Sequence, residues 1–422
     1  MQTKKEIWAD IQQIMQKDYS GCINQKDNNH PEKYVITNDM SDQEFEETIQ
    51  DYLLDFKDGH LGFWSVDTET PFIGFSVRRY EDALYVTKKS DEKRVKVGDK
   101  IKAIDNKGIE ELAKIHWKRL EDQVPERQWW GSVLSRATAI QVERNTVTFD
   151  MPLSHYEPIP YQPIYACEQL TDTTVYMQLT DFAQEAPIRD LIEENSHLLE
   201  KSNSLIIDVR TNHGGNDFFY SPLLQYVFPE ELTWQEMFKK DEVMFTNYTD
   251  RNCALLIEAM SGYLEQPLDS EAVVEIQSEI EQTKSNWGKG FLEISEEGDQ
   301  VIAGGPFPKQ VYILSDCYCG SSGDTFVANA KKSSKVTVVG RPTMGIVDYC
   351  NVVTADYGAF SFQYSVSKMN DPYFTNKTGV LPDVYIPWTP EHLKEDRDMK
   401  RVWELIESKE NTDIGNTTIK CS

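Results

Sequence analysis

The chain contains the run Val311-Tyr-Ile-Leu-Ser-Asp-Cys-Tyr-Cys-Gly-Ser-Ser-Gly-Asp-Thr-Phe-Val-Ala-Asn-Ala330, and the interpretation of the whole sequence starts from it. Its first four residues are a short apolar run of the kind that forms a buried strand. Apolar residues after position 325 recur at helical spacing. Two glycines and two serines, Gly320-Ser-Ser-Gly323, stand between these two patterns. The run therefore predicts a strand, a tight turn and a helix.

Two serines, Ser321 and Ser322, occupy the predicted turn just before the helix. The first backbone N–H groups of a helix have no intrahelical partner, and the helix dipole favours negative charge there. An oxyanion formed beside a serine in this turn would therefore find hydrogen-bond donors. We take Ser321 as the candidate nucleophile and Ser322 as the alternative. In a second interpretation, either serine only caps the helix, because serine is a preferred N-cap residue.

A second buried strand is predicted at Leu205-Ile-Ile-Asp-Val209, and Arg210-Thr-Asn-His-Gly-Gly215 follows it directly. Paired glycines at a strand end let a ligand approach the backbone and leave an N–H group for it. Gly214 and Gly215 are therefore candidates for an oxyanion hole, although they could also form a plain turn. Further strands and helices alternate along this part of the chain, which indicates βαβ units and a mostly parallel sheet.

The N-terminal region, residues 1–65, is predicted to be helical. Apolar residues at helical spacing indicate one helix near residues 4–17 and a second one that ends at about Phe56. Asp58-Gly59 ends the second helix, and His60 follows at the exit into a loop. An imidazole at that place can project into a cleft. The other interpretation is that His60 has only a structural role.

Residues 66–150 have the pattern of short strands joined by turns, and their centre resembles a PDZ domain. The resemblance rests on Val95-Lys-Val-Gly-Asp-Lys-Ile-Lys-Ala-Ile104, in which a Val-Gly-Asp turn leads into a strand. PDZ domains bind carboxyl-terminal peptides by strand addition. The resemblance places Ile73, Gly74 and Phe75 at the loop that holds the peptide carboxylate. The alternative is a small β-rich spacer without a peptide groove.

Composition limits the classes of partner. The 422 residues include 70 acidic and 43 basic side chains, which gives a formal charge of −27 at pH 7. Such a charge repels nucleic acid and anionic membranes, so we expect neither as a partner. The N-terminus lacks the apolar core of a signal peptide, and no apolar run reaches transmembrane length. The seven cysteines include no Cys-x-x-Cys pair. These features predict a soluble, cytoplasmic protein with reduced thiols.

Six motifs occur in an order that resembles the S41 family of serine peptidases, which includes the carboxyl-terminal processing and tricorn-like peptidases. They are Asp58-Gly-His60, Lys96-Val-Gly-Asp99, Leu205-Ile-Ile-Asp-Val-Arg-Thr-Asn-His-Gly-Gly215, Gly320-Ser-Ser-Gly-Asp324, Val338-Val-Gly-Arg-Pro-Thr343 and Gly379-Val-Leu-Pro-Asp383. The resemblance covers residues 41–390. It implies an α/β fold in which residues 151–422 form a crotonase-like, ββα-repeat catalytic core. Residues 66–150 would be a PDZ-like domain, and residues 218–304 a long, largely helical insertion in the core.

The resemblance also implies roles for single residues. Ser321 is the serine followed by two small residues and an acid, so it would be the nucleophile. One branch of the family activates this serine with a lysine, but the aligned residue here is Ile346, which cannot accept a proton. The other branch uses a histidine in a motif like Asp-Gly-His, and His60 fills that place. A Ser–His mechanism is therefore implied, with the Ser322 amide beside the two glycines in the oxyanion hole.

The acid that would orient the histidine is less clear. Where the family has a glutamate, this chain has Asn376, and Asp371 is the nearby acid that could replace it. We therefore predict a serine endopeptidase that acts on peptides or unfolded proteins and needs neither metal nor cofactor. A catalytically weak or inactive peptide-binding protein is the alternative. An esterase for small acyl substrates is a third possibility, because the motifs define the nucleophile better than the pocket.

Overall fold

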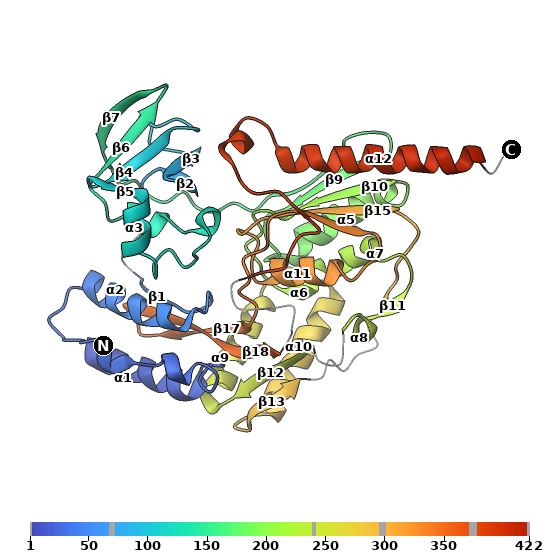
Figure 1. Ribbon diagram of the computed structural model, residues 1–422. Helices are drawn as coiled ribbons and strands as arrows, with labels where there is room; N and C mark the ends of the chain where they lie inside the picture. The colour runs from blue at the N-terminus through green and yellow to red at the C-terminus, as the bar shows by residue number, and fades with distance from the viewer. Residues whose placement is uncertain (1, 67–71, 239–241, 295–300, 371–377, 420–422) are drawn as a thin grey trace.

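The computed structural model describes residues 2–66, 72–238, 242–294, 301–370 and 378–419, except for the side chains of 412–419 (Figure 1). The fold is mixed α/β, as predicted. Figure 1 shows a small β sheet at the upper left, the N-terminal helices below it and a larger layered body to the right. The finer assignments, a crotonase-like core and a PDZ-like domain, stay predictions.

A six-stranded sheet forms the centre of the larger body, in the order β19-β16-β15-β10-β9-β8. All neighbours in it are parallel except the edge strand β8, which is antiparallel to β9. The predicted strands at 205–209 and 311–314 are confirmed as its two central members. The strands are β8 (Tyr165–Gln169), β9 (Thr174–Leu179), β10 (Ser204–Asp208), β15 (Gln310–Ser315), β16 (Val336–Gly340) and β19 (Val384–Tyr385).

Helices cover both faces of this sheet, because its central strands are apolar on both sides. Leu205 and Ile207 of β10 pack into a core with the helices of one face, whereas Ile206 between them packs with α12 on the other. This alternation follows from the two-residue period of a strand. The first face carries α5 (Glu185–Leu199), α6 (Asp217–Tyr220), α7 (Leu224–Val227) and α11 (Ser322–Ala330), and the second carries α12 (Arg397–Ile419).

A second sheet joins parts of the chain that are far apart in sequence. It has the order β1-β18-β12-β13, with β17 also paired to β18, and the N-terminal helices pack against it. The two predicted N-terminal helices are confirmed. The elements are α1 (Lys4–Gln13), α2 (Asp42–Leu53), β1 (Gly62–Ser65), β12 (Val243–Tyr248), β13 (Gly290–Ile294), β17 (Tyr349–Asp356) and β18 (Phe360–Asn370).

The predicted insertion at 218–304 is only partly helical. It contains α8 (Trp234–Met237), α9 (Asp250–Tyr263) and α10 (Ser270–Ser285), but also β11 (Leu232–Thr233), β14 (Val301–Ile302) and the strands β12 and β13. Because β12 pairs with β18, this segment and the N-terminal region complete one sheet with the C-terminal part of the chain. Short strands that pair with distant partners have no strong local pattern, which is why the sequence did not indicate them.

The small sheet in residues 72–152 is antiparallel and has the order β2-β3-β4-β6-β7, with β5 beside β4. It has its own apolar core, to which the helix α3 contributes. The predicted short strands of this region are confirmed. The elements of the region are β2 (Phe75–Tyr80), β3 (Ala83–Lys89), β4 (Lys100–Ile104), β5 (Lys107–Gly108), α3 (Ile109–Ile115), α4 (Gly131–Leu134), β6 (Ala139–Arg144) and β7 (Val147–Pro152).

In the part of the chain that the structure describes, we find no helix that is both long and apolar enough to cross a membrane.

Candidate active site

The predicted strand–turn–helix around Ser321 is confirmed. The strand β15 ends at Ser315 and the helix α11 begins at Ser322, so that Ser321 is the residue just before the helix. Its backbone has φ 56° and ψ −125°, a conformation that residues other than glycine rarely adopt. Strained serines at strand-to-helix turns present their hydroxyl group outward, as the nucleophiles of α/β-hydrolases do.

The carboxylate of Asp324 holds this turn in place. It accepts hydrogen bonds from the backbone N–H groups of Ser321 (3.0 Å), Gly345 (2.8 Å) and Ile346 (3.2 Å). Asp324 is fully buried, and burial raises its pKa, although these N–H groups act in the opposite direction. Asp324 thus links the turn of the candidate nucleophile to the loop that follows β16.

The side chains of His60 and Ser321 meet although they are 261 positions apart in the chain. His60 Nε2 lies 3.2 Å from Ser321 Oγ, at hydrogen-bond distance. His60 lies just before β1, and the pairing of β1 with β18 fixes its place. The side chain of Gln363 in β18 donates a hydrogen bond to the His60 carbonyl group (3.1 Å). The imidazole can therefore accept the proton of the serine hydroxyl group.

Ile346, the residue aligned with the lysine of the other family branch, lies at the same site. A methyl group built on Gly59 would lie 2.6 Å from Cγ2 of Ile346, so the two residues are in close contact. An aliphatic side chain thus borders the Asp58-Gly-His60 segment on this side. It offers no base that could replace His60.

The Gly214-Gly215 loop lies against Ser321. A Cβ atom on Gly214 would be 2.6 Å from Cβ of Ser321, and Gly214 has φ 79°, so only glycine fits there. However, the Gly214 N–H group already donates to Oδ1 of Asn212 (2.9 Å). The N–H groups of Gly215 and Ser322 donate to none of the described residues. These two amides are therefore the ones left for an oxyanion.

The Ser322 hydroxyl group is engaged elsewhere. It donates a hydrogen bond to the Gly215 carbonyl group (2.8 Å) and is almost fully buried. Asp217 lies next to it, and burial raises the pKa of Asp217 to about 6. Of the two serines in the turn, Ser321 is thus the one in contact with a histidine.

Asn212 is a central residue of the site that sequence reasoning missed. Its side chain is fully buried, donates to the Leu179 carbonyl group (3.0 Å) and accepts from Gly214. The backbone carbonyl group of Asn212 accepts a hydrogen bond from the N–H group of Gly320 (3.0 Å). Asn212 therefore ties the glycine loop to the serine turn. A polar residue between a buried strand and a Gly-Gly pair is the signal that could have identified it.

The predicted peptide-binding residues lie at the start of β2. The side chains of Ile73 and Phe75 belong to the core of the small sheet. Gly74 has φ 77°, and its carbonyl group accepts the N–H group of Ser90 (2.8 Å). The two candidates for the orienting residue, Asp371 and Asn376, lie outside the described residues.

Arginines connect the small sheet to the loops around Ser321. Arg78 of β2 forms a bidentate ion pair with Asp316, which directly follows β15, with both N···O distances at 2.7 Å. Arg127 donates to the carbonyl groups of three consecutive residues, 342 to 344. Residues 342 to 344 lead directly into Gly345 and Ile346, whose N–H groups donate to Asp324. The small sheet is therefore fixed directly to the segments that shape the site.

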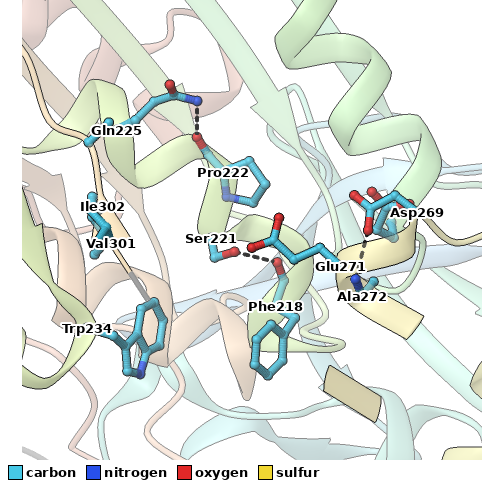
Figure 2. Close-up of a pocket in the computed structure, with 12 residues that line it drawn as sticks. Phe218, Ser221, Pro222, Gln225, Trp234, Asp269, Glu271, Ala272, Val301 and Ile302 are labelled. Carbon is cyan, nitrogen blue, oxygen red and sulfur yellow. Dashed lines mark hydrogen bonds between the residues drawn. The ribbon is translucent and has the colours of Figure 1, made fainter. Parts of the chain in front are cut away.

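A separate pocket of about 500 Å³ lies between α6, α8, α10 and β14 (Figure 2). Figure 2 shows Trp234 and Phe218 in the lower part of the view and Asp269 at the right, with Glu271 above Phe218. Glu185 also lines the pocket. Burial and the nearby Asp269 raise the pKa of Glu185, and its partner Arg189 opposes them. The lining residues do not include Ser321 or His60.

Comparisons with known proteins agree with this architecture. The model of a family described as "Peptidase family S41" matches residues 173–386. A protein of Chlamydia pneumoniae is 27% identical over 225 residues, which make up 48% of this chain but only 36% of that relative. Mature CPAF has a TM-score of 0.70 at 12% identity, with 96% of each chain covered. Mature CPAF complexed with lactacystin has a TM-score of 0.68 at 12% identity, with 96% of this chain and 97% of that one covered. At such identities the likeness concerns the fold alone.

Proposed function

Because this chain belongs to peptidase family S41, a family of serine proteases, we propose that it is a serine endopeptidase that cleaves peptides or unfolded proteins. The observation that carries the proposal is the 3.2 Å contact between His60 Nε2 and Ser321 Oγ. A serine becomes a nucleophile at neutral pH when a base within hydrogen-bond distance takes its proton. The strained conformation of Ser321 and the unused amides beside it support the same chemistry.

The proposed reaction has two halves. Ser321 Oγ attacks the carbonyl carbon of the scissile bond while His60 Nε2 takes its proton. The amides of Ser322 and Gly215 donate to the oxyanion, at the N-terminus of α11, where the helix dipole adds to the stabilisation. His60 then gives the proton to the leaving amine, and an acyl-serine remains. In the second half, His60 deprotonates a water molecule, which hydrolyses this ester and restores Ser321.

The small β sheet would present the substrate. Within the described residues, its strand β2 has only β3 as a neighbour in the sheet order, and strand addition at such an edge is how PDZ domains bind peptides. If Ile73-Gly74-Phe75 forms the carboxylate loop, peptides with a free carboxyl end should be cleaved with a higher kcat/KM than their carboxyl-amidated forms. Equal values for the two forms would count against this role.

The activity is tested by cleavage of a diverse peptide mixture, followed by mass spectrometry. We expect products with the wild type and a loss of at least about a thousandfold in Ser321→Ala and His60→Ala. Exposed residues of the same types, Ser261 in α9 and His197 in α5, provide matched controls, and their alanine variants should keep full activity. Hydrolysis retained in Ser321→Ala would rule out the assignment. Higher rates on ester than on peptide substrates would favour the esterase.

One observation favours a second candidate function, a noncatalytic peptide-binding protein. His60 Nδ1 is buried and has no hydrogen-bond partner among the described residues. A histidine without an orienting carboxylate is a poor base. If a correctly folded wild type gives no products but binds peptides saturably, and His60→Ala binds them equally well, this second function would replace the first.

A further inference from the structure

The unpartnered nitrogen of His60 is the starting point. The imidazole side chain is only 10% exposed, and its Nε2 atom contacts Ser321. Its Nδ1 atom is buried and has no hydrogen-bond partner in the part of the chain that the structure describes. When the imidazole takes a proton it becomes a cation, and a buried cation is costly without a counter-charge. The site therefore needs an acceptor on the Nδ1 side.

A carboxylate lies on that side. Asp58 Oδ1 is 3.9 Å from His60 Nδ1, and the Asp58 side chain is fully buried. The same oxygen accepts the backbone N–H group of His60 (2.8 Å), and Oδ2 accepts the hydroxyl group of Ser365 in β18 (2.9 Å). The carboxylate is thus fixed from two elements, and one of its anchors is the backbone of the histidine itself.

We propose that Asp58 is the carboxylate that positions His60 and stabilises the imidazolium ion formed when Ser321 attacks the substrate. This role rests on the proposed Ser–His peptidase activity. The distance of 3.9 Å is about 1 Å longer than a hydrogen bond, and catalytic hydrogen bonds are often long until substrate binds. Asp58 is a positioning residue, because it acts on the substrate only through His60.

The nearest titratable groups around Asp58 show which partners its carboxylate has. On balance the pKa of Asp58 is raised, because burial outweighs the opposing effects of His60, Ser365 and Tyr19. The other titratable groups that interact with Asp58 are Tyr19, Tyr349 and Cys350, and the carboxyls of Asp348 and Asp217 act in turn on Cys350. Burial raises the pKa of all three nearest groups, so they remain uncharged at neutral pH. None of these three supplies a cation that would compete with His60 for the carboxylate.

The test compares Asp58→Asn with the wild type in steady-state kinetics over a range of pH. Asparagine keeps the size and one acceptor but has no charge. We expect kcat to fall by about 10²- to 10⁴-fold, as in other serine peptidases that lose this carboxylate, with KM changed by less than about threefold. The acid limb of the pH–rate profile should move to lower pH, because the imidazolium loses its counter-charge. A merely structural role would reduce the folded fraction without moving this limb.

Two further measurements keep the inference falsifiable if Asp58→Asn fails to fold. Ser365→Ala removes one anchor but leaves the carboxylate, so it should lower kcat far less than Asp58→Asn and keep the wild-type pH profile. In the wild type, proton NMR of the adduct with a phosphonate inhibitor should show a strongly downfield Nδ1–H resonance of His60, which Asp371→Asn and Asn376→Ala should leave in place. Its absence from the wild type, or its loss in either variant, would overturn the assignment.

The outcomes separate this inference from the proposed function. A wild type that neither cleaves peptides nor reacts with a phosphonate at Ser321 would contradict the proposed function and this inference together. An active wild type, with Asp58→Asn retaining kcat within about threefold, would contradict the inference alone. A loss of about a hundredfold or more in Asp371→Asn, beside an unaffected Asp58→Asn, would move the role to that acid.

Discussion

Ser321 and Gly214 adopt backbone conformations with positive φ and touch each other, with φ values of 56° and 79°. At position 214, both the backbone conformation and the space available for a side chain require glycine. The loop approaches so closely that a Cβ atom would be 2.6 Å from the Ser321 Cβ and 3.1 Å from the Ser322 amide. The position of the candidate nucleophile therefore depends on a residue without a side chain that stands far earlier in the chain.

Gly214→Ala should therefore damage the site more than the fold. Its methyl group must displace Ser321, and a shift of about 1 Å in a reacting group can cost about a hundredfold in rate. The matched control is Gly98→Ala, because Gly98 has φ 90° but nothing within 4 Å of a Cβ atom. We expect each variant to lose about 1–2 kcal/mol from backbone strain, and only Gly214→Ala to lose activity. Urea denaturation and kcat/KM would be measured together, and equal activities would contradict this account.

At the scale of elements, a buried set of ion pairs joins the strand β2, the end of β15, the end of β16 and the helix α12. Asp316 accepts hydrogen bonds from Arg78 and also forms an ion pair with Arg341, whose Nε atom lies 2.9 Å from Oδ2 of Asp316. Arg341 in turn forms a pair with Asp398 in α12. Both side chains of the Arg78–Asp316 pair are less than a tenth exposed. Removal of one charged side chain would leave the buried charges of the others only partly neutralised.

Arg78→Met is expected to lower the free energy of unfolding by about 3–5 kcal/mol, because it leaves the buried carboxylate of Asp316 with one partner fewer. The control is Arg136→Met, since the side chains of the Arg136–Glu47 pair are 40% and 32% exposed, and its loss should cost no more than about 1 kcal/mol. Chemical denaturation of both variants at one salt concentration gives the comparison. Similar costs for the two would show that the buried pair does not stabilise the attachment of the small sheet.

At the scale of the whole molecule, these pairs make stability depend on pH. Burial alone would raise the pKa of Asp316, but Arg78 and Arg341 outweigh it and hold the pKa well below its ordinary range. The folded state then binds fewer protons than the unfolded state, in which an aspartate has a pKa of about 4. The stabilisation from Asp316 is therefore complete above about pH 4 and is lost as the pH falls towards the lowered value.

This dependence can be isolated with Asp316→Asn. The difference in unfolding free energy between the wild type and this variant should be largest near pH 7 and should shrink below about pH 4. Asp82→Asn serves as the control, because Asp82 pairs with lysines at an exposed site, and its difference should stay below about 1 kcal/mol throughout. Urea denaturation from pH 7 to about pH 3 measures both. A difference for Asp316→Asn that does not change with pH would contradict the argument.

The whole molecule also explains how His60 reaches Ser321. The N-terminal strand β1 pairs with β18, and β18 pairs with β12 from the middle of the chain. The sheet built from these three distant segments carries the histidine, whereas the mostly parallel central sheet carries the serine turn. The candidate site thus lies where the two sheets meet, and neither sheet contains both residues.

Much of this arrangement could be predicted from the sequence. The apolar run before Gly320 and the helical spacing after it specify a strand, a turn and a helix, because burial on both faces and helical periodicity leave local patterns. The same holds for β10 and the Gly214-Gly215 loop. The resemblance to S41 peptidases further predicted that Ser321 and His60 belong together.

Other features were decided only by the tertiary structure. Asn212 and Asp58 stand in motifs that the sequence had singled out, but their hydrogen bonds to Gly214, Gly320 and Ser365 depend on loops and strands brought together by folding. The sequence pattern did not predict the strands β12 and β13 for the same reason, since a strand is stabilised by its partner strands more than by its own residues. The sequence by itself determined the local elements and the reactive residue types. Long-range strand pairing decided which of those residues meet, because the distances between them are set by packing and not by spacing along the chain.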